Sequence, residues 1–319
     1  MKRKELNVEL YRGLFLIREA ESVIRKTYHE DVMKTPMHMS TGEEAICVGV
    51  CRALADSDQV LGTYRSHGLY LAKTGDTDRF FAELYGKVTG MAKGKGGSMH
   101  LTAPADGLIC TSAIVATTIP VAVGAAFANK CQANKKVVAA FFGDGAVDEG
   151  AFWESFNIAC AMKLPVLFVC EDNGYAVHIP AAQRHGYKSI TDIAAQFSCD
   201  VFGAETTDAE LIFQKSQQAV ASIRANMRPA FLYLKYYRHL EHVGINEDFD
   251  QRYRSRDEFE PWSKIDPVDL AREKLQQWLT ESEIGSIEGA IRARVADSVK
   301  KAIDASYPAS TELYEDVLA

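Results

Sequence analysis

Hydrophobic residues recur with a helical period at the start of the chain and form short continuous runs in its middle. Residues 5–28 predict a long amphipathic helix, whose apolar positions are Leu10, Leu14, Ile17, Ala20 and Ile24. Apolar runs at 135–142 and 165–172 predict two buried strands, and residues 148–163 between them predict a helix. A strand, a helix and a second strand in about forty residues indicate a right-handed crossover in a parallel sheet.

The alternation of helix and strand continues towards the C-terminus. A helix at 208–225 precedes a strand at 229–237, so we predict an α/β fold with a doubly wound parallel sheet. Further helices are expected after Thr41, which would cap a first turn rich in acids, and over residues 120–130. Two more are expected near the end of the chain, at 267–278 and 285–304.

We expect one domain over residues 1–319, with a helical arm at 1–30 and a helical tail at 263–319. Residues 238–262 are polar, charged and without a clear period, so they predict a long loop. Loops of that length in a compact domain are usually functional or disordered. We therefore expect this one to be an active-site loop.

Composition narrows the class of protein. A chain of 319 residues that is 47% hydrophobic and 25% charged is typical of a soluble globular protein, and no apolar run is long enough to cross a bilayer. The net charge of −7 argues against general affinity for nucleic acid. None of the seven cysteines has C-x-x-C spacing, which favours reduced thiols in the cytoplasm over zinc ligands or disulfides.

An aspartate stands between two glycines where the first predicted strand ends. Asp144 follows Gly143 and precedes Gly145, and a helix is expected to begin near Ala146. Ligands of open parallel sheets bind beyond the carboxyl ends of the strands, and helix N-termini offer free amides to anions. An acid would repel a bare phosphate, but it suits a magnesium ion that bridges carboxylate and phosphate oxygens.

A second polar group follows the next strand. Asn173, in the sequence "EDNGY", should emerge at the same sheet edge as Asp144 because a helical crossover joins their strands. Either motif alone is most often a turn. Together they predict a magnesium–diphosphate site. The dinucleotide fingerprint is excluded because Asp148 replaces its third glycine, and "GMAKGKGGS" lacks the spacing of a P-loop.

The spacing of these motifs resembles a known family. The sequence "GDG" is followed after 26 residues by "DN". This arrangement resembles the thiamin diphosphate motif of the transketolase-like superfamily. Over roughly residues 37–267 the chain is similar to the alpha chain of the decarboxylating component of 2-oxo acid dehydrogenase complexes, which include pyruvate, branched-chain and acetoin dehydrogenases. The blocks that carry this resemblance, in order, are "GTYRSHGLYLAKTGD", "AKGKGGSMHL", "FFGDGAVDEGAFWESFN", "LPVLFVCEDNGYAVH" and "YRSRDEFEPW".

The resemblance implies a set of site residues. Asp144, Asn173 and the Tyr175 carbonyl would hold magnesium. The residues implied to contact the cofactor are His38, Tyr64, Arg65, the Val115 backbone at the aminopyrimidine, and the Gly145 and Ala146 amides at the phosphates. His242, in "LEHVG", matches the catalytic histidine, with His239 as the neighbouring alternative, and Ser98 and His100 would line the entrance. Without the resemblance, these polar residues would be ordinary loop and turn positions.

The resemblance also implies the chemistry and the partners. Thiamin diphosphate with Mg²⁺ would support oxidative decarboxylation of a 2-oxo acid, most simply pyruvate, with acyl transfer to a lipoyl acyltransferase. The glutamate that activates the cofactor belongs to a separate beta subunit, so an α2β2 heterotetramer is expected. Neither nucleic acid nor membrane is an expected partner.

Some positions depart from the family pattern. Asp172 replaces the first of two asparagines, Ala113 replaces a glycine, and Val243 stands where mitochondrial members carry a phosphorylated serine, so regulation by that route is not expected. The substrate could also be acetoin, or the chain could belong to a split transketolase-like carboligase without a lipoyl partner. A non-catalytic nucleotide-sensing or assembly subunit and a phosphoryl-transfer enzyme are the remaining alternatives.

Overall fold

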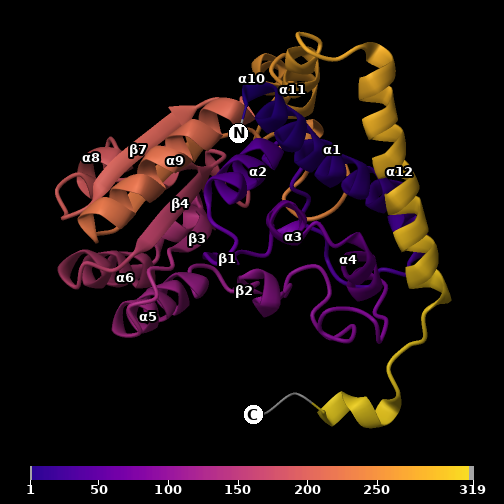
Figure 1. The fold of residues 1–319 in the computed structure, drawn as a ribbon, viewed down its shortest axis with the longest axis horizontal. Helices are drawn as coiled ribbons and strands as arrows, with labels where there is room; N and C mark the ends of the chain where they lie inside the picture. The colour runs from indigo at the N-terminus through magenta and orange to yellow at the C-terminus, as the bar shows by residue number, and fades with distance from the viewer. Residues whose placement is uncertain (1, 316–319) are drawn as a thin grey trace.

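The computed structural model describes residues 2–315 and is built around a parallel sheet of six strands (Figure 1). Their order across the sheet is β2-β1-β3-β4-β8-β7, and every neighbouring pair runs parallel. The strands are β1 (Gln59–Gly62), β2 (Leu108–Thr111), β3 (Val138–Gly143), β4 (Val166–Asp172), β7 (Asp200–Glu205) and β8 (Ala230–Lys235). The predicted doubly wound α/β fold is thereby confirmed.

Alternate residues of the central strands enter two different cores, because successive side chains of a strand point to opposite faces. Along β3, Val138, Ala140 and Phe142 pack into one apolar cluster. Ala139 and Phe141 pack into the other. Both faces are covered, which explains why the central strands read as continuous apolar runs instead of alternating ones.

Helices cover both faces of the sheet. The first face carries α5 (Thr118–Cys131) and α6 (Gly150–Ala161), which lie side by side in Figure 1. The second face carries α2 (Glu44–Ala53) and α9 (Ala209–Asn226), and α1 (Arg3–Thr27) packs over α2. The other longer helices are α3 (His67–Thr74), α4 (Thr77–Leu84), α10 (Arg256–Ser263), α11 (Pro267–Leu275) and α12 (Glu281–Asp304).

Short elements complete the chain. They are the hairpin β5 (Tyr175–Ala176) and β6 (Ile179–Pro180), the helices α7 (Ala181–Arg184) and α8 (Ile190–Ala194), and the 3₁₀ turns η1 (Tyr28–Glu30), η2 (Pro104–Asp106), η3 (Asp144–Asp148), η4 (Phe249–Gln251) and η5 (Ser310–Tyr314). The C-terminal helices pack against the rest of the domain: α11 contacts α1, and α12 runs along α1 and α4 (Figure 1). Within residues 2–315, no helix is both long and apolar enough to cross a membrane.

Two sequence predictions need correction, and three strands were not predicted at all. Thr41 is not a helix cap, since α2 begins at Glu44 and the Thr41 hydroxyl donates instead to Glu21 Oε2 at 2.7 Å. Residues 238–262 are not all loop, because α10 begins at Arg256 behind a Ser255 cap. The pattern also missed β1, β2 and β7. The first two are only four residues long, and β7 is partly exposed, so none produces a long apolar run.

The strand order places a crevice at the carboxyl end of the sheet. From β1 the chain moves outwards to β2, and it then returns to form β3 on the other side of β1. Such a reversal opens a crevice beyond the two strand ends, and this is where doubly wound sheets bind ligands. Thr63 to Arg65 follow β1 and Asp144 follows β3, so the predicted site residues flank this crevice.

Candidate functional site

Asp144 lies buried at the carboxyl end of β3, with 3% of its surface exposed. The Arg184 guanidinium donates to its Oδ2 atom, whereas its buried Oδ1 atom has no hydrogen-bond partner within residues 2–315. Burial raises the pKa of Asp144 to about 6, the negative charge of Asp172 adds to the rise, and Arg184 opposes it. A buried carboxylate oxygen without a partner is costly, which suggests that it serves a ligand.

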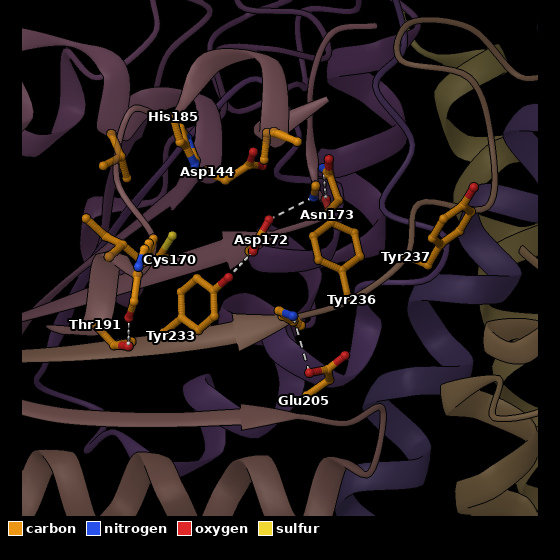
Figure 2. Close-up of a pocket in the computed structure, with 18 of the residues that line it drawn as sticks. Asp144, Cys170, Asp172, Asn173, His185, Thr191, Glu205, Tyr233, Tyr236 and Tyr237 are labelled. Atoms are coloured by element: carbon orange, nitrogen blue, oxygen red, sulfur yellow. Dashed lines mark hydrogen bonds and ion pairs between the residues drawn. The ribbon is translucent and has the colours of Figure 1, made fainter. Parts of the chain in front are cut away.

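Asn173 lies beside Asp144 because β3 and β4 are neighbours, with Gly143 paired to Glu171. The Asn173 Nδ2 atom donates to the Tyr236 hydroxyl at 2.9 Å, and its Oδ1 atom accepts the Tyr175 amide at 3.0 Å. Figure 2 shows Asp144, Asp172 and Asn173 gathered at the ends of these strands. The structure therefore brings the two predicted side-chain metal ligands together.

A cavity of about 280 Å³ opens at the crevice between β1 and β3. Of the residues predicted to contact the cofactor or the metal, all except His38 line it: Tyr64, Arg65, Val115, Asp144, Gly145, Ala146, Asn173, Tyr175 and His242. Residues from widely separated parts of the chain thus converge on one volume. His239, the alternative histidine, is not among the lining residues and lies near Asp266, with 3.7 Å between its Nδ1 atom and the carboxylate.

Three aromatic rings pack together at one side of the cavity, where Tyr64 and His242 line it and His38 lies behind them. The ring centroid of His38 lies 4.5 Å from that of Tyr64 and 5.4 Å from that of His242, and the last two are 5.5 Å apart. Burial, with the positive charge of Arg65, lowers the pKa of both His38 and His242 to about 3. Both histidines are therefore neutral at neutral pH. The buried Nδ1 atom of His38 has no partner within residues 2–315.

Buried arginines fix the position of His242. Arg65 Nη2 donates to the His242 carbonyl at 2.9 Å, and Arg65 Nη1 donates to the Met39 carbonyl at 2.7 Å. Arg238 Nη1 lies 3.5 Å from His242 Nδ1. Because a guanidinium can only donate, this contact favours a proton on Nε2 of the neutral ring. The sequence reasoning missed Arg238, which stands in a polar stretch without any motif.

The turn after β3 differs from the expected helix start. Residues 144–148 form the 3₁₀ turn η3, and α6 begins only at Gly150. Gly145 is required by close packing, since a Cβ atom there would lie 2.9 Å from the Ala176 Cβ atom. Val115 also lines the cavity, and 45% of its surface is exposed. The next residue, Ala116, has a positive φ of 63°.

Comparisons with known proteins agree with this geometry. The family described as "Dehydrogenase E1 component" matches residues 12–311. The chain belongs to this family. It is 33% identical to the alpha subunit of acetoin:2,6-dichlorophenolindophenol oxidoreductase of Bacillus subtilis (strain 168), over 97% of this chain and 92% of the relative. It is also 33% identical to the pyruvate dehydrogenase E1 component subunit alpha of Rhizobium meliloti (strain 1021), over 99% and 90%. The corresponding subunit of Zymomonas mobilis is 32% identical, over 99% and 89%.

In this E1 chain the donor set fits a hard divalent cation and a diphosphate. The unpartnered Asp144 Oδ1, the Asn173 amide oxygen and the nearby Tyr175 backbone supply only oxygen ligands, which magnesium prefers. Gly145 lets the backbone approach a ligand closely. Arg65 and Tyr64 line the same cavity and provide donors that suit phosphate oxygens.

Two buried acids that the sequence reasoning missed also line the cavity of this E1 chain. Burial raises the pKa of Glu43 to about 7 and also raises the pKa of Glu171, while Arg65 opposes both shifts. The buried Glu43 Oε1 atom has no partner within residues 2–315. Both acids lie close enough to Arg65 for its charge to act on them. Glu171 stands in the "EDNGY" motif, but the motif gave neither acid a role.

Residues 86–97 of this E1 chain, which we name the Gly/Lys-rich loop, are organised by a carboxylate. Buried Glu83 accepts the amides of four loop residues, at distances of 2.8 to 3.1 Å: Ala92, Gly94, Gly96 and Gly97. Ser98 does not line the entrance, because it is fully buried and 2.7 Å separates its hydroxyl from His67 Nε2. His100 is exposed and is not among the residues that line the cavity. The loop amides thus bind a protein carboxylate.

Proposed function

We propose that this E1 chain is the alpha subunit of a thiamin diphosphate- and magnesium-dependent 2-oxo acid dehydrogenase, of the pyruvate type. One observation carries the proposal. The two predicted metal ligands share a single cavity with the predicted cofactor-binding and catalytic residues, and this cavity lies where the strand order reverses between β1 and β3. These residues are Asp144, Asn173, Tyr64, Arg65 and His242. Family membership and the pyruvate dehydrogenase relatives support it.

Asp144, Asn173 and the Tyr175 carbonyl would hold Mg²⁺. Tyr64, Arg65 and His38 would face the diphosphate together with the Gly145 and Ala146 amides, and the Val115 backbone would meet the aminopyrimidine. When bound, thiamin diphosphate supplies an electron sink that allows a 2-oxo acid to lose carbon dioxide.

His242 would be the catalytic residue. Its ring is neutral because burial and Arg65 lower its pKa to about 3, and Arg238 beside Nδ1 favours the tautomer with the proton on Nε2. In that form His242 can donate a hydrogen bond from Nε2 to an anionic group in the cavity. The packed rings of His38 and Tyr64 hold it in place.

The subunit would work with a beta subunit in an α2β2 heterotetramer. Apolar side chains are exposed beside the cavity and along α5 and α6, with 41% to 64% of their surface accessible: Ile114, Val115, Val121, Phe127, Ile158 and Met162. We name these residues the α5–α6 surface. An apolar surface of this kind marks a protein interface, and it adjoins the exposed side of the cavity at Val115. A beta subunit there would complete the site.

The remaining assignments follow from this reading. We propose one domain over residues 1–319, a cytoplasmic location, and acyl transfer to a lipoyl acyltransferase. Acetoin is the second candidate substrate, because the Bacillus subtilis relative at 33% identity acts on acetoin by its name. A split transketolase-like carboligase would use the same cofactor site without a lipoyl partner.

Calorimetric titration tests the cofactor assignment. Thiamin diphosphate and Mg²⁺ are titrated into the chain, alone and with a co-expressed beta subunit, and the Asp144→Ala variant is compared with wild type. We expect binding that requires Mg²⁺, Asp144 and the beta subunit. Turnover of pyruvate and of acetoin, with and without a lipoyl acceptor, then separates the three substrate assignments. An absence of binding in every combination would disprove the proposed function.

A further inference from the structure

Arg184 is a cation placed directly on the proposed metal ligand. Its Nη2 atom donates to Asp144 Oδ2 and its Nη1 atom donates to Asp148 Oδ2, while its Nε atom donates to the Ile179 carbonyl at 3.2 Å. The Arg184 side chain is only 10% exposed. A planar guanidinium that bridges two carboxylates is a specific arrangement, because its paired donors match both partners at once.

The charges around Arg184 explain why a cation is needed there. Asp144 lies beside Asp172 across adjacent strands, and Asp148 adds a third carboxylate at the end of η3. Tyr233 and the Gly174 amide donate hydrogen bonds to Asp172, and neither brings a positive charge. Arg184 is therefore the cation that neutralises Asp144 in this structure.

A divalent metal on Asp144 Oδ1 would lie close to the guanidinium that Arg184 places on Oδ2. The ion would take a carboxylate oxygen of Asp144, and it would bring two positive charges to within a few ångströms of the guanidinium. Like charges at that separation repel strongly in a buried site. Since the metal carries twice the charge of Arg184, occupation by the metal favours withdrawal of the arginine.

The segment that carries Arg184 is built to move. Residues 179–187, which we name the arginine segment, contain only the two-residue strand β6 and the four-residue helix α7, and Ala182, Gln183 and Gly186 are exposed. Among the residues that the structure describes, its backbone is anchored at one end only, by the pairing of β6 with β5 and by the Ala181 amide, which donates to the Gly174 carbonyl at 2.8 Å. A segment with so few buried apolar contacts opens at low cost.

We propose that Arg184 is a built-in counter-cation that a divalent metal displaces from Asp144, so that metal binding releases the arginine segment from the carboxyl end of β3. The proposal rests on the proposed function, because it takes Asp144 as the metal ligand. The arginine keeps the acid cluster neutral before the cofactor arrives, and it competes with the metal for the same carboxylate.

Two measurements test the displacement without using activity. The first is the rate at which phenylglyoxal modifies Arg184 in the full chain with its beta subunit, followed by mass spectrometry, with thiamin diphosphate present and Mg²⁺ added or omitted. We expect Mg²⁺ to raise the rate at least threefold. Arg224 is the matched internal control, because it also pairs with a buried aspartate, Asp58, but lies away from the cavity. Its rate should not change.

The second measurement is the affinity for Mg²⁺ at saturating thiamin diphosphate, by calorimetry. Arg184→Gln should bind Mg²⁺ about fivefold more tightly than wild type, because a partly buried ion pair contributes about 1 kcal/mol. Arg184→Lys should lie between the two, since one ammonium group cannot bridge Asp144 and Asp148 as a guanidinium does. Arg224→Gln should leave the affinity unchanged.

The outcomes separate this proposal from the proposed function. If Mg²⁺ binds but Arg184 stays protected, or if Arg184→Gln binds Mg²⁺ equally or more weakly, the displacement is disproved while the cofactor site stands. If neither wild type nor variant binds Mg²⁺ with thiamin diphosphate, both proposals are wrong. Should Arg184→Gln fail to fold, the modification rate in wild type and the affinity of Arg184→Lys still decide.

Discussion

Arg65 Nη2 donates a hydrogen bond to the backbone carbonyl of His242 at 2.9 Å. The same guanidinium donates to the Met39 carbonyl at 2.7 Å, so one buried side chain ties together the exit of β1, the segment before α2 and the loop after β8. Arg65 is 6% exposed. Arg65 therefore holds segments of the site together and also lines the cavity.

Replacement of Arg65 should loosen the His242 loop. In Arg65→Gln the carbonyls of Met39 and His242 lose their charged donor, and each unsatisfied buried group costs about 1–3 kcal/mol. We expect the free energy of unfolding to fall by about 2–4 kcal/mol, measured by urea denaturation. Arg12→Gln, at a half-exposed arginine of α1, is the control and should change little. Unchanged stability in Arg65→Gln would mean that the loop does not depend on this arginine.

Stability should depend on pH through His38. Burial lowers the pKa of His38 to about 3 in the folded chain, against about 6.5 when unfolded. Between these values only the unfolded state gains a proton, so the stabilisation is complete above about pH 6.5 and is lost as the pH falls towards 3. His38→Gln should flatten this slope by up to about 1 kcal/mol per pH unit. Exposed His29→Gln is the control, and equal slopes in wild type and His38→Gln would contradict the assignment.

Glu83 should govern the order of the Gly/Lys-rich loop. The Glu83→Gln variant keeps the shape of the side chain but replaces one acceptor oxygen with an NH₂ group that faces amide donors. We expect a loss of about 2–3 kcal/mol in the free energy of unfolding and faster hydrogen exchange in residues 90–97. Glu154→Gln, on the exposed side of α6, should do neither. Slow exchange retained in Glu83→Gln would show that other contacts order the loop.

The α5–α6 surface should be needed for assembly. Phe127→Asp places a charge where a beta subunit would bury an apolar side chain, while the exposed position spares the fold. We expect the complex with the beta subunit to be lost in size-exclusion chromatography with light scattering, and the unfolding transition of the chain to be unchanged. Ile303→Asp, on α12 at 56% exposure, is the matched control. A complex that forms normally with Phe127→Asp would remove this surface from the interface.

Local pattern predicted much of this fold because the relevant signals are local. The strands β3 and β4 and the helix α6 between them carry long apolar runs or a clear period, and each was predicted to within a few residues. Four-residue strands such as β1 and β2 produce no such signal. Their place in the sheet depends on long-range pairing, of β1 with β3 and of β2 with β1.

The sequence by itself determined the α/β class and the pairing of Asp144 with Asn173 across one crossover, and through family resemblance it singled out His242 as the catalytic candidate. Only the tertiary structure decided which charged groups surround them. Arg184 and Arg238 belong to no motif, and the motifs gave Glu43 and Glu171 no role. These four residues reach the site because the chain returns to the same sheet edge from distant segments. Burial then sets their protonation, since the cost of removing a charge from water depends on the whole folded environment and not on neighbours in sequence.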